Sequence, residues 1–340
     1  MQTTVPYPKV WAGKMRAAQP LANETLEDTL TKKLLRWAVA LTLSCAASAF
    51  AQQDPIRIIH GSNAGAPQDV MLRILADEMT KAGGRPVIVE PRPGASGQIA
   101  MTALKQAPAD GQTIFSDGTG ITSILQLPGH LHAWTDFEPL YRIQLDPFAL
   151  YANPKKYPDL KALMQDMRAR PEAVRIGGYA IGGPFQIVLM LIAQKEKASF
   201  TWIPYDSGTK AITAVMGDHM EAAMTNISVY SSFREKMVIL AHTGESRFEQ
   251  FPEVPTFKER GVDIVRYHWR GMVLKKGTPE PVIDRTYALV GTGVKSARFQ
   301  AYLKDSATLD GTMTRAAMAE MLAEQARGDT VILKQLKLIK

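Results

Sequence analysis

The fold is decided by residues 54–118, which read DPIRIIHGSNAGAPQDVMLRILADEMTKAGGRPVIVEPRPGASGQIAMTALKQAPADGQTIFSDG. Short apolar runs rich in β-branched residues alternate here with longer amphipathic runs. The predicted strands cover 55–59, 86–90 and 112–116, and the predicted helices cover 70–82 and 98–107. This order predicts a βαβαβ unit with parallel strands, because a helix separates each strand from the next.

Two loops rich in small residues, 61–69 and 92–97, join these elements. Each loop leads from the end of a strand into the start of a helix. At that point, free backbone N–H groups and the helix dipole favour an anionic ligand. The unit therefore predicts a site for a small anion at one edge of the sheet.

The second half of the chain repeats the strand–loop–helix arrangement. Leu160, Leu163, Met164 and Met167 recur at helical spacing, which predicts a helix over 160–170. Further strands are predicted at 174–176, 200–204 and 221–224, and further helices at 209–216 and in an apolar stretch that ends near 195. The segments 134–139 and 148–154 are interpreted as a turn followed by a strand. The sequence thus predicts a second α/β part.

An export signal precedes the folded part. Lys32, Lys33 and Arg36 flank the start of an apolar run that ends in small residues at Ala49 and Ala51. A basic start, an apolar core and an A-x-A site are typical of a secretory signal peptide. A membrane anchor is the alternative, but the run is shorter than the roughly 20 residues that a spanning helix needs.

We therefore expect residues 32–51 to be a signal peptide, cleaved after Ala51, and the mature protein to be periplasmic. Residues 1–31 carry acidic residues ahead of the basic start and show no apolar periodicity. They are interpreted as an unstructured leader or as a start codon assigned too early.

Composition limits the function classes. Cleavage removes six basic and three acidic residues, which lowers the net charge from +7 to +4 and leaves about 289 residues. The remaining Lys and Arg are scattered, with no basic run interleaved with aromatics, so we expect no nucleic-acid partner. Cys45, the only cysteine, lies in the predicted signal. The mature chain therefore has no disulfide, cysteine nucleophile or thiolate metal site.

Enzyme motifs are missing from the sequence. It contains no Gly-x-Ser-x-Gly elbow, no His-Glu-x-x-His and no Walker loop. The pair His130 and His132 has no third ligand nearby and is interpreted as part of a surface loop. We expect neither an enzyme nor a bound cofactor or metal.

Several longer motifs resemble one protein family. The most specific ones are Val89-Glu90-Pro91-Arg92-Pro93-Gly94-Ala95-Ser96-Gly97, Ala109-Asp110-Gly111-Gln112-Thr113-Ile114, Pro252-Glu253-Val254-Pro255-Thr256-Phe257-Lys258-Glu259-Arg260-Gly261 and Trp269-Arg270-Gly271. On these motifs the chain resembles the solute receptors of tripartite tricarboxylate transporters, also called the Bug or TctC-type family. The resemblance covers residues from about 54 to 335.

The resemblance implies an α/β fold of two lobes, the type II periplasmic binding protein or Venus flytrap, with a ligand cleft between the lobes. It implies that the chain crosses between lobes near 152–155 and 265–270. Lobe one is then expected to hold 54–153 plus 270–340, and lobe two 154–269.

The resemblance also implies a function. The chain is expected to be a monomeric receptor that delivers a small organic carboxylate to the subunits of a membrane permease. A ligand-sensing receptor that acts on a membrane sensor kinase is the alternative, because both use closure of the cleft around the ligand. A periplasmic hydrolase is a more distant alternative.

Four loops, 65–69, 92–97, 177–183 and 205–208, are expected to converge on the cleft. The expected ligand-binding residues are Gly65, Ala66, Gln68, Asp69, Arg92, Gly178, Tyr179, Ala180, Gly182, Tyr205, Asp206, Asn226 and Arg270. Asp69 has a second interpretation, as a cap that rigidifies its own helix. Asp206 repels an anion unless it bonds a ligand hydroxyl, a protonated group or an arginine, for which Arg270 is the candidate.

Departures from the family pattern point to an altered ligand. Asn63, Gln68, Tyr179 and Phe185 stand where the family tends to have small or ring-forming residues. A close-packed core would resist such changes, whereas a cleft wall accepts them. We therefore expect these side chains to line or border the cleft, and the ligand to differ from citrate.

Overall fold

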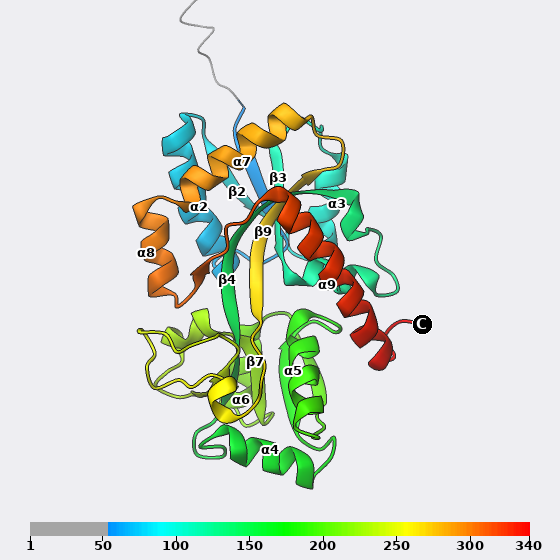
Figure 1. The fold of residues 1–340 in the computed structure, drawn as a ribbon, viewed down its shortest axis with the longest axis vertical. Helices are drawn as coiled ribbons and strands as arrows, with labels where there is room; N and C mark the ends of the chain where they lie inside the picture. The colour runs from blue at the N-terminus through cyan, green and yellow to red at the C-terminus, as the bar shows by residue number, and fades with distance from the viewer. Residues whose placement is uncertain (1–53) are drawn as a thin grey trace, which may run out of the picture. The chain divides into compact units, whose positions relative to one another are not determined.

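The computed structural model describes residues 54–340, which alternate between strands and helices (Figure 1). The strands are β1 (Ile56–His60), β2 (Val87–Pro91), β3 (Thr113–Gly118), β4 (Phe137–Ala152), β5 (Arg175–Tyr179), β6 (Thr201–Tyr205), β7 (Ala222–Asn226), β8 (Val238–His242), β9 (Tyr267–Lys275) and β10 (Leu309–Asp310). The α-helices are α2 (Pro67–Gly83), α3 (Gln98–Gln106), α4 (Leu160–Ala169), α5 (Pro184–Lys195), α6 (Gly208–Met216), α7 (Glu280–Val294), α8 (Ala297–Asp305) and α9 (Arg315–Gln335).

The predicted βαβαβ unit is confirmed. β1 lies between β2 and β3 and pairs in parallel with both, while α2 and α3 make the connections. Helix α2 begins at Pro67, three residues earlier than predicted. Proline fits the first turn of a helix, because its missing N–H would have no partner there.

Strand β4 joins the two halves of the sheet and is 16 residues long. Its first part pairs antiparallel with β9 up to Pro147, and its last part pairs with β7 and β8 from Phe148 onward. The sequence predicts a turn at 134–139 and a strand only at 148–154. The pairing with β9 shifts register beside Pro139, and such bulges accommodate proline in a strand.

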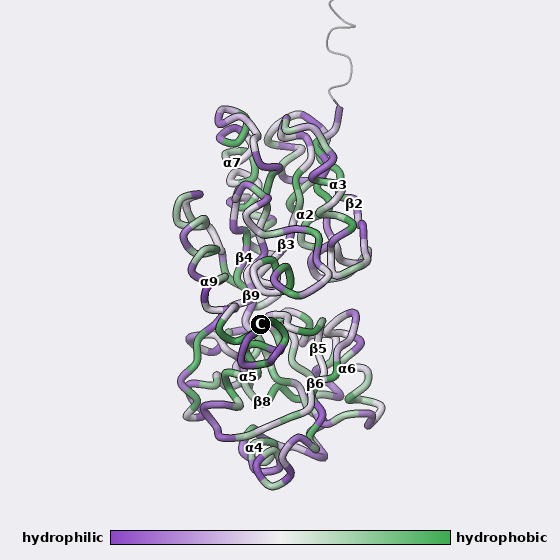
Figure 2. Tube along the Cα trace, turned by 90° about the vertical axis from the view of Figure 1, so that its right-hand side faces the viewer, coloured by the Kyte–Doolittle hydropathy of each residue, from purple (hydrophilic) through white to green (hydrophobic). Residues whose placement is uncertain are grey.

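Two α/β lobes result. We call lobe one the part built on β1, β2 and β3 with α2, α3, α7 and α8, and lobe two the part built on β5–β8 with α4–α6. β4 and β9 run from one lobe into the other, and Figure 2 shows them between the lobes. The residue limits predicted for the lobes stay predictions.

Each lobe has its own apolar core. In lobe one, α2 buries Leu72, Leu75 and Met79 against the sheet and against α7. In lobe two, α4 and α5 cover β5 and β7, with Leu163 and Leu189 fully buried. Two separate cores allow each lobe to hold its loops rigidly at the edge that faces the other lobe.

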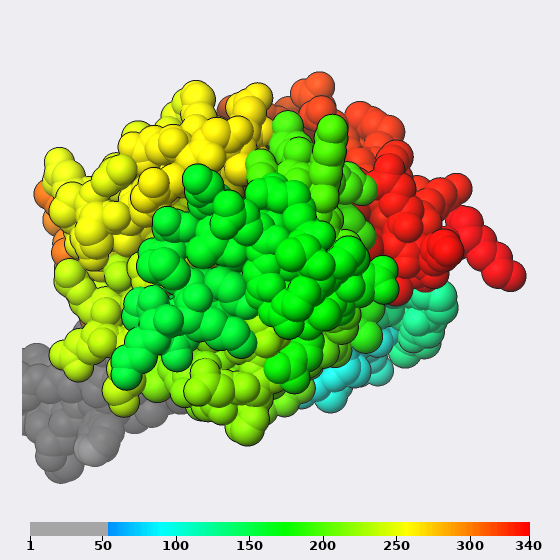
Figure 3. Space-filling view, turned by 90° about the horizontal axis from the view of Figure 1, so that it is seen from below, coloured from blue at the N-terminus to red at the C-terminus, as the bar shows by residue number. Residues whose placement is uncertain are grey.

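The C-terminal helix α9 touches both lobes. Near its start, Arg315 contacts Glu138 of β4, and near its end, the Gln194 amide of α5 donates to Gln335 at 3.1 Å. Between them, the Thr122 hydroxyl donates to Asp329 at 2.6 Å. Figure 3 shows this helix in red beside the green surface of lobe two.

The predicted leader and signal peptide, and the cleavage after Ala51, lie outside the described residues. Within residues 54–340, no helix combines the length and the apolar character needed to cross a membrane.

Candidate functional site

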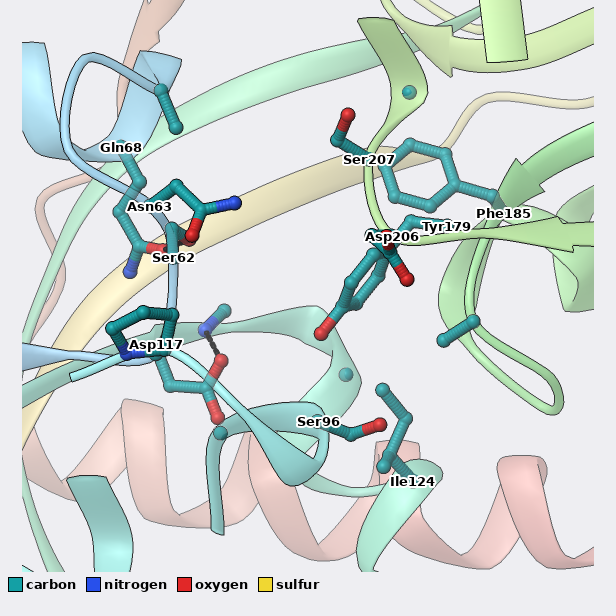
Figure 4. A pocket seen from close by; sticks show the side chains of 18 of the residues that line it. Ser62, Asn63, Gln68, Ser96, Asp117, Ile124, Tyr179, Phe185, Asp206 and Ser207 are labelled. Carbon is teal, nitrogen blue, oxygen red and sulfur yellow. Dashed lines mark hydrogen bonds between the residues drawn. The ribbon is translucent and has the colours of Figure 1, made fainter. Parts of the chain in front are cut away.

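A cavity of about 1150 Å³ is lined by both lobes and by β9 (Figure 4). Lobe one contributes the loop after β1, the loop after β2 and the segment after β3. Lobe two contributes the loops after β5, β6 and β7. Because all of these loops follow the carboxyl ends of strands, the cavity lies where α/β sheets generally bind ligands.

Four helices start at the cavity. They are α2, α3, α5 and α6, and residues next to each start line the cavity wall. The residues that precede α2, α3 and α5 are Ala66, Gly97 and Gly183, and none of them caps its helix with a side chain. Ser207 caps α6 by accepting from the Lys210 N–H. Three of the helix starts therefore leave first-turn N–H groups without a side-chain acceptor, which favours an anion.

The loop before α2 is fixed from below by Asp69. This carboxylate accepts the Gly65 N–H at 2.9 Å, the Arg73 guanidinium at 2.9 and 3.1 Å, and lies 3.0 Å from the His60 ring nitrogen. Burial alone would raise the pKa of Asp69, but the bonds from Arg73, Gly65 and His60 lower it overall. Burial lowers the pKa of His60, so the ring is neutral. Asp69 is thus a charged acid that holds the loop.

Asp117 is a second acid at the end of a strand, and it lines the cavity itself. One of its oxygens accepts the N–H of the next residue, Gly118, at 2.8 Å. Burial raises the pKa of Asp117 to about 7, although the Gly118 N–H acts in the opposite direction. At neutral pH this carboxyl group is therefore close to half protonated when the cavity holds no ligand.

Tyr179 faces Asp117 across the cavity from lobe two (Figure 4). Burial, together with the nearby charges of Asp117 and Asp206, raises the pKa of Tyr179 to about 12, so the phenol keeps its proton. The adjoining Ala180 has a φ of 60°, and Ser96 on the opposite loop has a φ of 53°. Non-glycine residues rarely adopt this left-handed region, and such strain is common at ligand sites.

Arg270 on β9 lines the cavity, and its side chain is held by an ion pair with a buried acid of β4. Its guanidinium donates to Asp146 of β4 at 2.9 Å, and the Ser228 hydroxyl donates to the same carboxylate at 2.6 Å. Both charged side chains are almost fully buried. The arginine predicted to pair with Asp206 therefore pairs with Asp146 instead, while Asp206 accepts from Lys210 at 2.6 Å on the exposed rim.

Asn226 and His268 add polar atoms at the back of the cavity. Asn226 is 5% exposed, and its side-chain nitrogen has no hydrogen-bond partner among residues 54–340. An unpaired buried amide is costly, so this N–H₂ group is available to an acceptor on a ligand. His268 stacks on Phe185, with ring centroids 5.4 Å apart, and burial holds its pKa well below the usual value.

Nine of the thirteen predicted residues line the cavity. They are Gly65, Ala66, Gln68, Tyr179, Ala180, Tyr205, Asp206, Asn226 and Arg270. The Gln68 amide is already engaged, because it donates to Ser116 and accepts from Ser62 at 2.7 Å. The departures Asn63 and Phe185 also lie on the cavity wall.

Four predicted residues do not line the cavity, and each has a structural role in the fold; a contact between them and a ligand stays a prediction. Asp69 is buried beneath the loop. Arg92 pairs with Glu90 at 3.0 Å. Gly178 packs so closely that a Cβ there would lie 2.4 Å from the Trp202 ring. The N–H of Gly182 is taken by Gln186, which accepts it at 2.7 Å.

Several polar residues of the cavity are not among the predicted binding residues, namely Ser62, Asp117, Ser207, Thr225 and His268. Asp117 had a usable signal, because it is a charged residue directly after the third strand of a βαβαβ unit, where ligands bind. Ser62 and Ser207 lie within two loops that were expected at the site, whereas Thr225 and His268 carry no such signal. The pair His130 and His132 belongs to no metal-binding cluster within the described residues, and His132 lies 2.8 Å from the Thr102 hydroxyl.

Two α/β lobes, a cavity between them and a pair of linking strands define the chain as a two-lobed solute-binding protein. Residues 71–338 match the model of the tripartite tricarboxylate transporter family receptor. The chain belongs to this family, which confirms the resemblance seen in the sequence. Since the family consists of solute receptors, the chain is a receptor and not an enzyme.

Two relatives illustrate the match. A UPF0065 protein in the gbd 5′ region of Cupriavidus necator is 26% identical over 295 residues, which are 85% of this chain and 89% of the relative. The protein BugT of Bordetella pertussis is 29% identical over 239 residues, which are 67% of this chain and 73% of BugT.

Solved structures share the fold. MatC from Rhodopseudomonas palustris, with bound malate, superposes with a TM-score of 0.74 at 21% identity, covering 82% of this chain and 98% of MatC. The periplasmic binding protein BugD superposes with a TM-score of 0.74 at 22% identity, covering 84% of this chain and 99% of BugD. An R. palustris protein with adipate gives 0.76 at 20% identity, covering 82% of this chain and 96% of that protein. The two-lobed α/β fold predicted from the sequence is confirmed by these matches.

Proposed function

We propose that this chain is a periplasmic receptor that binds a small organic carboxylate in the cavity and delivers it to a tripartite tricarboxylate-type membrane permease. The observation that carries the proposal is the set of uncapped helix starts at one cavity, with the unpaired Asn226 amide among them. Backbone N–H groups at helix starts and an amide N–H₂ are all donors, and a carboxylate is acceptor-only. The donors of the cavity therefore suit a carboxylate.

The solved relatives support this ligand class, because MatC holds malate and the R. palustris protein holds adipate. Delivery to a permease rests on the family to which the chain belongs. A periplasmic location rests on the signal peptide predicted at 32–51. Cleavage of this signal peptide predicts that the exported protein begins at Gln52. An intact mass that still includes residues 32–51 would refute the proposed export.

A thermal-shift screen of purified protein against organic acids, neutral sugars and amines without a carboxylate tests the ligand class. A ligand at 100 times its dissociation constant adds about 2.7 kcal/mol to the free energy of unfolding, which gives a clear shift. We expect shifts from carboxylates and none from sugars. Shifts from sugars, with none from any compound that carries a carboxylate, would exclude the proposal.

Ala66→Glu supplies a control variant in the same cavity. Ala66 precedes α2 and lines the wall. A glutamate there adds a negative charge beside an uncapped helix start, where it competes with the ligand carboxylate. We expect this variant to remain folded and to lose the shift with acids, whereas Val70→Glu, on an exposed position of the same helix, should keep it.

A further inference from the structure

The charged side chains of the cavity are unequally partnered. Arg270 is paired with Asp146, and Asp206 is paired with Lys210. Asp117 makes no ion pair with any residue in the range 54–340, and the Gly118 N–H is its recorded donor. Asp117 is therefore the charged group of the cavity wall that lacks a counter-charge within the described residues, and its charge is negative. The ligand proposed for this cavity also carries a negative charge.

A structural role does not explain Asp117, as comparison with Asp69 shows. Both acids lie close to the carboxyl end of a strand of lobe one. Asp69 is surrounded by donors from His60, Gly65 and Arg73, and these keep its pKa low. Asp117 has a single backbone donor, and burial raises its pKa to about 7. Asp117 is partly buried at the cavity wall and has a single donor from the protein, so its carboxylate can bind a partner from outside the chain.

The surroundings of Asp117 indicate what such a partner must offer. Tyr179 faces it and remains protonated, and Ser96 lies on the adjoining loop (Figure 4). The two histidines of the cavity wall, His268 and His130, have pKa values lowered by burial and bring no positive charge. A simple dicarboxylate would place a second negative charge in this cavity, whereas a cationic nitrogen would neutralise Asp117.

We propose that the ligand is an ammonium-bearing carboxylate whose cationic nitrogen is bound by Asp117, while its carboxylate is held at the helix starts of the cavity. This inference rests on the proposed function and refines it, because it makes Asp117 the specificity-determining residue. Attraction to an ammonium group and repulsion of a second carboxylate act together, and specific sites commonly combine the two. The malate-bound and adipate-bound relatives would then differ from this chain in ligand charge.

Titration calorimetry with matched ligand pairs tests the inference. Each pair differs only in an amino group: aspartate and succinate, glutamate and glutarate, 4-aminobutyrate and butyrate. At pH 8 the wild-type protein should bind the amino member at least tenfold more tightly in one or more pairs. In Asp117→Asn, which keeps the shape and loses the charge, that preference should fall at least tenfold. Asp117→Ser should behave in the same way, which covers a failure of the first variant to fold.

Asp77→Asn is the control. It removes an exposed carboxylate of α2 that is paired with Arg298 and lies outside the cavity wall. This variant should keep the wild-type preference. The inference is overturned if the acid without the amino group binds wild-type protein as tightly as its amino partner in every pair. It is also overturned if the Asp117 variants keep the wild-type preference. Neither result contradicts the proposed function as a carboxylate receptor. Binding of neither member of any pair, together with binding of sugars, would overturn the proposed function and the inference with it.

Discussion

Asp117→Asn should make the unliganded protein more stable at high pH. Burial raises the pKa of Asp117 from 3.8 to about 7 in the folded state. Between pH 4 and pH 7, the folded chain therefore holds a proton that the unfolded chain has released. Stability falls with rising pH wherever the folded state binds more protons, so wild-type protein loses stability across this window. The asparagine variant carries no titrating group at this position and escapes the loss.

The magnitude follows from the size of the pKa shift. A shift of about three pH units, at 1.36 kcal/mol per unit, corresponds to on the order of 4 kcal/mol. Water that enters the open cavity reduces this value, so we expect the difference between variant and wild type to grow by about 1–4 kcal/mol from pH 4 to pH 8. Most of the change should occur between pH 5 and pH 7.5.

Urea unfolding of both proteins at pH 4.5, 6 and 8, after removal of any bound ligand by refolding, measures this difference. Asp69→Asn supplies a control with the opposite sign, because the bonds from Arg73 and Gly65 lower the pKa of Asp69 overall. That variant should be destabilised at all three pH values, and the loss should shrink only at lower pH, below the unfolded pKa of 3.8, as the pH falls through the folded pKa. A pH-independent difference between wild type and Asp117→Asn would show that the Asp117 carboxyl is well solvated and would refute this prediction.

Three further substitutions test other parts of the site. Asp146→Ala should cost about 3–5 kcal/mol in urea unfolding, because it leaves Arg270 buried without a partner; a double variant that also replaces Arg270 by methionine should recover much of the loss. Gly208→Ala should lower the free energy of unfolding by about 1–3 kcal/mol, because a Cβ there would lie 1.9 Å from the Thr225 hydroxyl oxygen. Gly328→Ala in α9, where a Cβ would meet no neighbour, is its control and should be neutral or stabilising by up to about 1 kcal/mol. Tyr179→Gly should change ligand preference in a thermal-shift screen while the free protein stays folded; an unfolded protein would make Tyr179 a packing residue.

Local patterns predicted most of the secondary structure, because apolar spacing and small-residue turns act over a few residues. The helix at 160–170 is observed as α4, Leu160–Ala169, with the four predicted apolar residues buried. Strand β4 was predicted only in part, since Pro139 and Pro147 lower the strand signal. What keeps this segment extended is pairing with β9, more than 100 residues later in the chain, and no local pattern contains that information.

The cavity residues were predicted unevenly, and for a physical reason. Loops at helix starts are visible in a sequence, so Gly65, Ala66, Tyr179 and Ala180 were placed at the cavity correctly. Whether a side chain in such a loop faces the cavity or is used by the protein itself depends on distant partners. Arg92 is paired with Glu90, and Asp206 is paired with Lys210 of the helix that follows it, α6.

The two acids Asp69 and Asp117 show how much depends on distant partners. Asp69 lies in the first turn of α2, and Asp117 lies near the end of β3. Their difference arises only in the folded chain, where Arg73 and His60 reach Asp69 and no cation reaches Asp117 within the described residues. The first acid therefore stabilises a loop of the cavity, and the second lowers the stability of the unliganded protein until a ligand neutralises it. A ligand that reverses this destabilisation gains the corresponding free energy on binding, so the same residue that weakens the free protein favours the cationic ligand.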